Sequence, residues 1–315
     1  MTDSNGNLLA AVTDGDVRRA LLAGHGLDSR ADAAFNTNFF ALEENVDSAH
    51  VTAGAAKNGF REYPVVDSDG RLVCVEVQGS GGERVARDNT VVVMAGGKGL
   101  RLRPLTEETP KPLLLVRGKP ILQHIIDNLR DEGFSDIVLA INYLGEQIES
   151  YFQDGSSFGV NIRYIKEDRA LGTAGALSLL QEPISSPIVV MNGDLVLAAS
   201  VGKMVDYHLE KQATITVGAK VVETTIPFGV LSTRGLVVEG IAEKPTYRDL
   251  VNAGVYVLNS EIFAPLSANQ SFDMPELILE NVDAGKVIAF PMHETWADLG
   301  HPLDLSRAQD LMGGE

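Results

Sequence analysis

The stretch VVVMAGGKGLRLRPLTEETPKP, residues 91–112, decides the fold class of this 315-residue chain. An apolar run leads into glycines at 96, 97 and 99, a pattern typical of a buried strand whose following turn brings backbone close to a ligand. Residues 95–119 hold six cations and two anions, although the formal net charge of the whole chain is −17. Exposed backbone N–H groups beside concentrated positive charge suit phosphate oxygens. The stretch therefore predicts a phosphate-binding turn after a strand.

Downstream of this turn, strand-like and helix-like segments alternate. Strands are predicted at 89–95, 136–142, 161–167 and 186–194, and helices at 119–133, 146–152 and 172–181. Continuous apolar strands joined by helices indicate an α/β domain with a Rossmann-like, mostly parallel sheet. Further strands, with less helix between them, are predicted at 214–222, 228–233, 236–242 and 253–259. They suggest an antiparallel extension over the ligand side, where polar residues follow the carboxyl ends of the parallel strands.

The composition excludes several classes of protein. The acidic balance argues against a protein that coats nucleic acid, and the lone Cys74 excludes an intrachain disulfide and a cysteine-rich zinc site. The sequence contains no signal-peptide pattern and no run of about 18 apolar residues, so we expect a soluble cytoplasmic protein without a membrane span.

The glycine-rich, polar residues 79–89 are predicted to be a linker. They would separate a small α+β module at 1–78 from a larger domain at 90–315. Within the module, strands are predicted at 7–13, 61–67 and 71–77, and helices at 17–24 and 47–59.

The spacing of the opening stretch matches neither the GxGxxG dinucleotide fingerprint nor the P-loop. GGKGLRLRPLT…PKP instead resembles the signature of the sugar nucleotidyltransferases, which join a nucleoside triphosphate to a sugar 1-phosphate and release pyrophosphate. Five further motifs follow in that family's order: LGTAGAL (171–177), NGD (192–194), EKP (243–245), NAGVYVL (252–258) and WADLGHP (296–302). Taken alone, each also fits a turn, a helix cap or a loop, whereas their order over residues 90–308 favours the enzyme.

The resemblance implies a role for individual residues. The nucleotide would be bound by Ala95, Gly96, Gly97, Gly99, Leu100, Gly172 and Thr173, with Leu100 where the family usually has Thr or Ser. The sugar phosphate would be bound by Gly193, Glu243, Lys244, Asn252 and Gly254. Mg²⁺ would be held by Asp194 and Asp298, whose carboxylates are the hard oxygen ligands that this ion prefers. The catalytic residues would be Arg101, Lys111, Asp194 and Lys244.

Two classes of function stay open. One is an enzyme that transfers a guanylyl group to mannose or glucosamine 1-phosphate, or else a thymidylyl or uridylyl group to glucose 1-phosphate. The other is a catalytically inactive protein that senses nucleotides. The combination of Asp194, Asp298 and Lys244 favours the enzyme, since a sensor does not need all three. His208, His293 and His301 have no metal-ligand spacing and are interpreted as surface or supporting residues.

Residues 12–24 and 61–75 resemble cystathionine-β-synthase (CBS) motifs, which occur in pairs and often bind adenine nucleotides. The first repeat begins at its central strand. The resemblance places Thr13 and Asp16 at an adenylate site, although a structural or dimer-forming module is the favoured interpretation. Paired modules of this kind suggest a homodimer.

Overall fold

The computed structural model describes residues 1–26, 28–44, 62–77, 86–180, 184, 187–267, 270–301 and 304–305. Its contacts divide the chain into two units, Met1–Arg84 and Val85–Glu315, which are described separately below. The division falls inside the predicted linker at 79–89, most of which lies outside the described residues, as does the predicted helix at 47–59. Among the described helices, none is long and apolar enough to cross a membrane.

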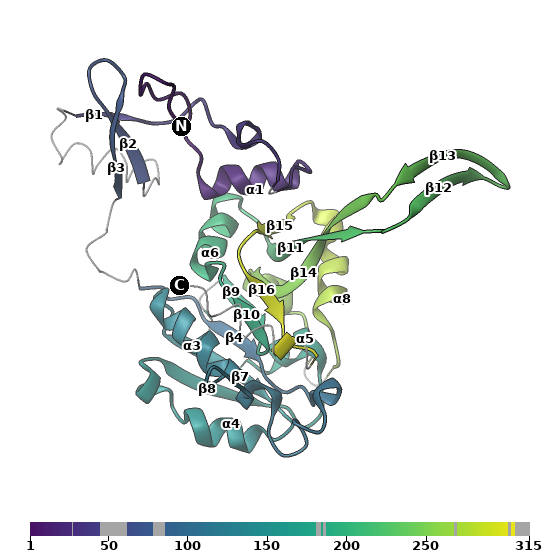
Figure 1. The fold of residues 1–315 in the computed structure, drawn as a ribbon. Coiled ribbons are helices and arrows are strands. Elements are labelled where there is room, and N and C mark those ends of the chain that lie inside the picture. The colour runs from purple at the N-terminus through teal and green to yellow at the C-terminus, as the bar shows by residue number, and fades with distance from the viewer. Residues whose placement is uncertain are drawn as a thin grey trace. The chain divides into compact units, whose positions relative to one another are not determined.

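The larger unit is built on a seven-stranded sheet of order β15-β11-β14-β9-β4-β7-β8 (Figure 1). Its strands are β4 (Val91–Met94), β7 (Asp136–Ile141), β8 (Asn161–Lys166), β9 (Ile188–Asn192), β11 (Ile215–Thr225), β14 (Thr246–Leu258) and β15 (Val287–Met292). Strands β9, β4, β7 and β8 run parallel, whereas β14 pairs antiparallel with both β9 and β11. The prediction of a mostly parallel α/β sheet with an antiparallel extension is confirmed for this unit.

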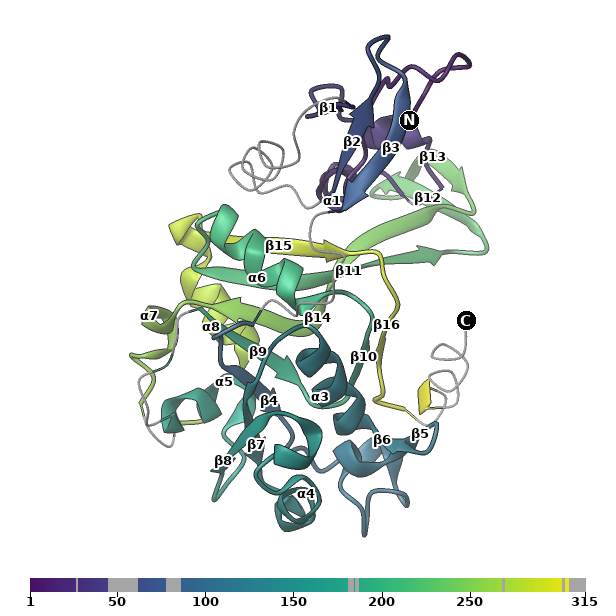
Figure 2. The same ribbon diagram turned by 90° about the vertical axis from the view of Figure 1, so that its left-hand side faces the viewer.

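Helices cover both faces of the sheet (Figure 2). They are α3 (Ile121–Asp131), α4 (Gly145–Phe152), α5 (Gly172–Gly175), α6 (Val201–Glu210), α7 (Ser260–Phe263) and α8 (Met274–Asn281), with short 3₁₀ turns η2 (Leu100–Leu102), η3 (Lys111–Leu113), η4 (Ser156–Phe158), η5 (Ala176–Leu179) and η6 (Val282–Ala284). Val91 and Val93 of β4 pack in the core beneath α3, α4 and α6, whereas Val92 packs in the core beneath α5, α7 and α8. Alternate residues of one buried strand thus supply both cores.

The predicted helices at 119–133 and 146–152 are confirmed as α3 and α4. Helix α3 buries apolar residues at helical spacing, including Leu122, Ile126 and Leu129, and ends before Gly133, whose φ is 93°. The prediction at 172–181 is only partly right, because α5 continues as the 3₁₀ turn η5 and ends at Leu179.

Three smaller pairings complete the unit. Strands β10 (Leu195–Leu197) and β16 (Trp296–Asp298) pair antiparallel, as do β5 (Leu115–Val116) and β6 (Lys119–Pro120). Strands β12 (Gly229–Arg234) and β13 (Val237–Glu243) form a hairpin that extends the ladder of β11 and β14 away from the sheet (Figure 1).

The smaller unit contains a three-stranded sheet of order β1-β2-β3. Its elements are α1 (Asp14–Leu22), the 3₁₀ turn η1 (Ala31–Ala34), β1 (Leu42–Glu43), β2 (Glu62–Val66) and β3 (Leu72–Val77). The predicted strand at 7–13 is wrong: residues 2, 7, 8 and 11 form only isolated bridges, because this segment pairs in turn with three different partners. The resemblance of this unit to CBS modules stays a prediction.

Helix α6 begins on a carboxylate that another helix supplies. Glu132, at the end of α3, accepts hydrogen bonds from the backbone N–H groups of Val201 and Gly202 at 3.2 and 2.6 Å, and from the Ser200 hydroxyl at 2.7 Å. It therefore satisfies backbone donors that a helix N-terminus otherwise leaves without an intrahelical partner, and it joins α3 to α6.

We predict that Glu132→Ala lowers the free energy of unfolding by about 1–3 kcal/mol, because these donors lose their acceptor in a partly buried place. Urea denaturation followed by circular dichroism measures the change. Glu210→Ala, at an exposed glutamate in the last turn of α6, is the control and should change the stability much less. Equal effects of the two substitutions would contradict this role of Glu132.

Candidate functional site

A cavity of about 270 Å³ lies at the carboxyl ends of β4 and β9. Its walls combine glycine backbone with polar side chains. They are formed by Met94, Gly96, Gly97, Ala140, Glu167, Ala170, Gly172, Thr173, Asn192 and Asp194. The structure thus brings together five of the predicted site residues, which come from three separate motifs, at the edge of the sheet where open α/β folds bind ligands.

Two glycines of the turn, Gly96 and Gly99, approach their neighbours closely, whereas Gly97 has open space around it. A Cβ at Gly96 would lie 3.0 Å from Cβ of Asn142 and 3.2 Å from Oε2 of Glu167. Gly99 has a φ of 58°, and a Cβ there would lie 2.9 Å from Cγ2 of Thr106. Thr106 is fully buried and donates its hydroxyl to the Gly99 carbonyl at 2.8 Å, which fixes the turn. Bare backbone therefore faces the cavity, as predicted.

The remaining residues of the turn differ in exposure. Ala95 is buried and donates its backbone N–H to Ala140 at 2.8 Å, so it belongs to the sheet rather than to the cavity wall. Leu100 is 58% exposed. The contacts of Ala95 and Leu100 with a nucleotide stay predictions.

A buried cation lies between two carboxylates beside the cavity. Lys111, which is 8% exposed, forms an ion pair with Asp194, and its Nζ lies 3.8 Å from Oδ1 of Asp298. Antiparallel pairing of Leu195 in β10 with Asp298 in β16 brings the two acids together, although they are far apart in the sequence. The backbone N–H of Leu299 also donates to the Asp194 carbonyl at 3.1 Å.

The acidic pair has the character of a divalent-cation site. Burial, followed by repulsion from the Asp194 carboxylate, raises the pKa of Asp298, although Lys111 and Arg101 act in the opposite direction. Oδ1 of Asp194 is buried and has no hydrogen-bond partner among the residues that the structure describes. One lysine does not satisfy both acids, and oxygen ligands of this kind fit Mg²⁺.

Arg101 is a second cation near Asp298 and acts to lower the pKa of that acid. Its guanidinium Nη2 would be 3.4 Å from a Cβ placed at Gly300, and its Nη1 lies 3.4 Å from Nε2 of His301. Two of the six cations predicted from the sequence, Lys111 and Arg101, therefore lie near Asp298.

Gly172 and Thr173 form another part of the cavity wall. Gly172 has a φ of 80°, and a Cβ there would lie 2.5 Å from Oδ1 of Asp273. The Thr173 backbone N–H donates to the same Asp273 oxygen at 3.0 Å, and its hydroxyl accepts from the Met274 N–H at 2.8 Å. The start of α5 is thus attached to the start of α8.

The predicted sugar-phosphate residues separate into two groups. In the first group, Gly193 donates its N–H to the Met94 carbonyl at 2.8 Å, and Asn252 accepts from the Gly254 N–H at 3.0 Å. A Cβ at Gly254 would lie 2.6 Å from Nδ2 of Asn192, a residue of the cavity wall. This group therefore adjoins the cavity.

The second group lies at the base of the β12–β13 hairpin. Glu243 pairs with Gly229 in the ladder, and the Lys244 N–H donates to the Phe228 carbonyl at 3.3 Å. Both side chains are exposed, and neither lines the cavity. Their contacts with a sugar phosphate stay predictions.

Three polar residues in or beside the cavity were not predicted from the sequence: Asn142, Glu167 and Asn192. Each follows or ends a parallel strand, so the rule that ligands bind at the carboxyl ends of strands could have identified them. Glu167 lines both this cavity and a neighbouring one of about 460 Å³, and the Asn142 side chain donates to the Glu167 carbonyl at 2.6 Å. Burial raises the pKa of Glu167 to about 7.

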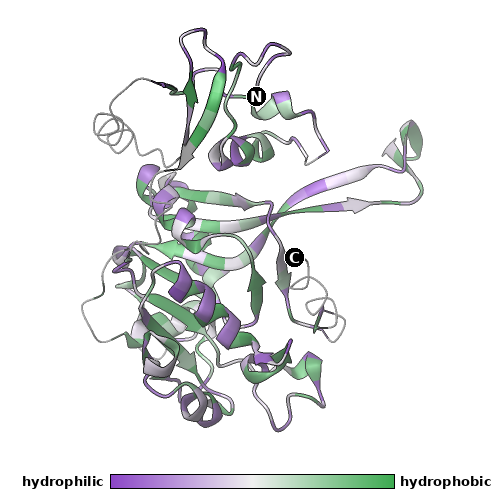
Figure 3. Ribbon diagram, turned by 60° about the vertical axis from the view of Figure 1, so that its left-hand side comes forward, coloured by the Kyte–Doolittle hydropathy of each residue, from purple (hydrophilic) through white to green (hydrophobic). Residues whose placement is uncertain are grey.

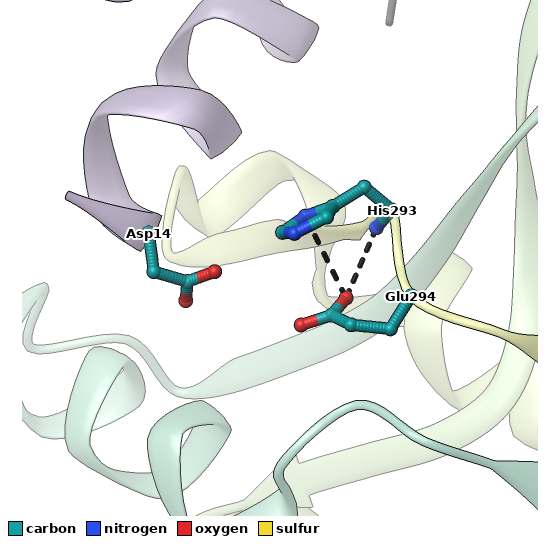
Figure 4. A group of neighbouring side chains, drawn as sticks. All are labelled: Asp14, His293 and Glu294. Atoms are coloured by element: carbon teal, nitrogen blue, oxygen red, sulfur yellow. Dashed lines mark hydrogen bonds and ion pairs between the residues drawn. The ribbon is translucent and has the colours of Figure 1, made fainter. Parts of the chain in front are cut away.

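The histidines outside the cavity have structural partners. His208 is buried rather than at the surface, with Nδ1 2.8 Å from Thr216 Oγ1 and Nε2 3.1 Å from Asn259 Oδ1, and burial lowers its pKa. The His293 ring faces the Glu294 carboxylate, with Nδ1 3.6 Å from Oε2, and the His293 backbone N–H donates to that oxygen (Figure 4). Asp14, also drawn there, belongs to the other unit.

In the smaller unit, Thr13 and Asp16 form a capping box at the start of α1. The Thr13 hydroxyl donates to Oδ2 of Asp16 at 2.6 Å, and the Asp16 N–H donates back to Thr13 Oγ1 at 3.3 Å. Asp16 also lines a cavity of about 300 Å³, together with Arg19 and His25. The contacts support a structural role for both residues, and adenylate binding stays a prediction.

We predict that Glu167 makes the stability depend on pH. Its pKa in the folded chain, about 7, lies above its usual value of 4.5, so the folded chain binds this proton more tightly than the unfolded chain. The stability that it contributes is fully present below pH 4.5 and is lost as the pH rises through 7. Urea denaturation across this range should show Glu167→Gln gaining stability relative to the parent chain as the pH rises. A constant difference would contradict the pKa assignment.

Comparison with known proteins is consistent with this geometry. A family model described as nucleotidyl transferase matches residues 90–313. UTP–glucose-1-phosphate uridylyltransferase of Synechocystis sp. is 33% identical over 242 residues, which are 69% of this chain and 61% of that protein. Mannose-1-phosphate guanyltransferase of Saccharomyces cerevisiae is 32% identical, over 68% of this chain and 62% of that protein. The chain thus spans about three fifths of the length of these relatives.

Solved structures are similar over a comparable share of the chain. HddC from Yersinia pseudotuberculosis has a TM-score of 0.57 at 26% identity and covers 71% of this chain and 99% of its own. A complex of the same protein with GMP-PN has a TM-score of 0.56 at 25% identity, with the same coverage. The family match, the relatives and the site geometry agree, and the chain belongs to the nucleotidyl transferase family.

Proposed function

We propose that the protein transfers a nucleotidyl group from a nucleoside triphosphate to a hexose 1-phosphate, giving a nucleoside-diphosphate sugar and pyrophosphate. The observation that carries this proposal is the Lys111–Asp194–Asp298 cluster beside a cavity walled by glycine backbone. Such a site combines what a triphosphate requires: donors that approach closely, positive charge, and carboxylates for a divalent cation.

In this proposal the nucleotide occupies the 270 Å³ cavity. Backbone at Gly96 and Gly97 faces the phosphates, and Gly172 and Thr173 form another part of the wall. Glu167, which lines this cavity, offers a carboxylate to the base. A carboxylate accepts from neighbouring N–H groups, which suits guanine better than a pyrimidine base.

The reaction is an in-line substitution at phosphorus. A phosphate oxygen of the sugar 1-phosphate attacks the α-phosphorus, the bond to the β-phosphate bridging oxygen breaks, and pyrophosphate leaves with that electron pair. Catalysis of this kind depends on positioning and on stabilising negative charge. Arg101 and Lys111 stabilise charge on the triphosphate and the leaving pyrophosphate, and Lys244 holds the attacking phosphate.

Mg²⁺ is the proposed cofactor. Asp194 and Asp298 would hold it, and it would supply positive charge at the α-phosphate. The buried Asp194 oxygen and the neighbouring Asp298 carboxylate support this role, and Lys111 keeps the two acids close together.

We propose GTP with mannose or glucosamine 1-phosphate as the preferred substrates. Relatives named as mannose-1-phosphate guanylyltransferases support the guanylyl group, as do the GMP-PN complex of HddC and the Glu167 carboxylate. The uridylyltransferase of Synechocystis favours the second candidate, uridylyl or thymidylyl transfer to glucose 1-phosphate. Homodimerisation and adenylate binding by the amino-terminal unit belong to the same proposal.

An inactive nucleotide sensor is the third candidate. Binding a nucleotide requires the glycine backbone but not two carboxylates around a buried lysine. That cluster is costly to desolvate and has a clear use in phosphoryl chemistry, so it favours the enzyme.

The test is pyrophosphate release with Mg²⁺, over four nucleoside triphosphates crossed with glucose, mannose and glucosamine 1-phosphates. The proposal predicts one strongly preferred pair that contains GTP. Preference for UTP or dTTP with glucose 1-phosphate would move the assignment to the second candidate. Nucleotide binding without turnover in any combination would support the sensor.

Two variants test the assigned residues with the preferred pair. Asp194→Asn and Lys111→Met should each lower kcat by about 10²–10³-fold, since each removes a charge that stabilises the transition state. The controls are Asp283→Asn and Lys119→Met, the latter an exposed lysine of the same basic segment, paired with Asp127. Near-normal turnover of either site variant, with unchanged circular dichroism, would refute the role of that residue.

A further inference from the structure

Residues 293–295, called the connector below, join β15 to β16 and so determine where Asp298 lies. Figure 2 shows this part of the chain passing from the large sheet to the short β10–β16 pair. Strand β16 has three residues and, among the described residues, pairs only with β10. Because two paired strands are marginally stable in water, a fixed position of Asp298 requires further contacts.

A lysine of the large sheet supplies one of these contacts. Lys220 lies on β11, paired with Met292 at the end of β15. Its ammonium donates to the His293 carbonyl at 3.2 Å and to the Glu294 carbonyl at 2.8 Å. An ammonium has three N–H donors, and hydrogen bonds from a charged donor are stronger than neutral ones. Lys220 thereby attaches two consecutive peptides of the connector to β11.

The place of Lys220 in the sheet is unusual for a cation. The sheet buries mostly apolar side chains (Figure 3), and Lys220 is the only charged residue in residues 215–222. It is partly buried, and burial lowers its pKa, whereas the Glu294 carboxylate acts in the opposite direction. Burying a charge is costly unless hydrogen bonds compensate. The two carbonyls of the connector provide this compensation.

Further contacts continue from the connector to the acid. The Thr295 carbonyl accepts from the Ala198 N–H at 2.9 Å. The Trp296 indole N–H donates to the carbonyl of Ala253, a buried residue, at 2.9 Å. From there β16 pairs with β10 as far as Asp298. An unbroken series of contacts thus runs from the connector to the acid.

The strands that hold this segment also carry residues proposed to bind the sugar. Ala253 lies between Asn252 and Gly254 on β14. On β11, the neighbour of Lys220 is Ala219, which pairs with Asn252. A shift of the connector would therefore move the acid relative to the proposed sugar-binding residues.

We propose that Lys220 is a positioning residue for the metal site: by holding the connector on β11, it keeps Asp298 where that acid and Asp194 bind Mg²⁺ together. The inference rests on the proposed function, because it takes Mg²⁺ as the ion that the acidic pair binds. Lys220 acts through the backbone of the connector and not on the ion. Groups that orient metal ligands in this indirect way typically contribute about 10–100-fold to metal affinity.

Calorimetric titration with GTP, with and without Mg²⁺, tests the role of Lys220. Lys220→Met keeps an unbranched side chain and removes its donors. The factor by which Mg²⁺ raises the affinity should fall roughly tenfold in this variant, while the affinity without Mg²⁺ stays the same. Lys220→Arg, whose guanidinium offers several N–H donors, should recover most of the factor. Lys286→Met, at an exposed lysine just before β15, is the control and should match the parent chain.

The single tryptophan of the chain reports on the connector directly. Trp296 adjoins the connector and is partly buried. In Lys220→Met its emission should shift to longer wavelength and its quenching by acrylamide should increase, whereas Lys220→Arg and Lys286→Met should keep the parental spectrum. Neither readout requires turnover. A parent chain without turnover would therefore refute the proposed enzyme and still leave the role of Lys220 open to both tests.

A purely structural role would give a different result. Lys220→Met would then lower the free energy of unfolding, while its folded fraction would respond to Mg²⁺ as the parent chain does. An unchanged effect of Mg²⁺, or an unchanged emission of Trp296, would overturn the inference. If Lys220→Met does not fold, Trp296→Phe tests the same positioning, because it keeps an aromatic ring and removes only the indole N–H contact with Ala253. It should also reduce the effect of Mg²⁺, and an unchanged effect would overturn the inference.

Discussion

The structure depends on holding one lysine between two carboxylates that the sequence separates widely. Lys111 is almost fully buried, and without Asp194 and Asp298 its charge would be costly to desolvate. Conversely, the two acids would repel each other without the lysine. The cluster is therefore stable only while three segments meet: the loop after β4, the end of β9 and the strand β16. The same three residues therefore connect these segments of the fold and form part of the candidate site.

The sheet provides the geometry that the cluster requires. Parallel pairing of β4 with β9 places the glycine-rich turn beside Asn192 and Asp194, because both strands end at the same edge. The short pair β10–β16 then returns the carboxyl-terminal part of the chain to Asp194. Continuous apolar strands make this possible, since both of their faces are covered by helices and the polar residues are left to the strand ends.

Much of the fold could be predicted from the sequence, because apolar strands alternating with helices indicate a parallel sheet. Part of the candidate site could be predicted as well, because the recognised motifs follow these strands. The sequence did not show which polar residues line this cavity and the neighbouring one: Glu167 and Asn142 belong to no motif that was recognised, although both lie close to Gly96. Helix α6 was not predicted, although Ser200 caps its N-terminus and its buried residues Val201, Met204, Val205 and His208 have helical spacing, so the local signal was present. The exposure of the β12–β13 hairpin, by contrast, is a tertiary property that strand patterns do not contain.

The central claim is that the acidic pair binds the metal of a nucleoside triphosphate. It is tested most directly by calorimetric titration of the parent chain and of Asp298→Asn with nucleoside triphosphate, with and without Mg²⁺. If the Lys111–Asp194–Asp298 cluster binds a metal-bound triphosphate, Mg²⁺ should raise the affinity of the parent chain at least tenfold. In the variant this gain should largely disappear, while binding without metal persists. An equal gain from Mg²⁺ in both proteins would contradict the account, because the metal would then bind without the acidic pair.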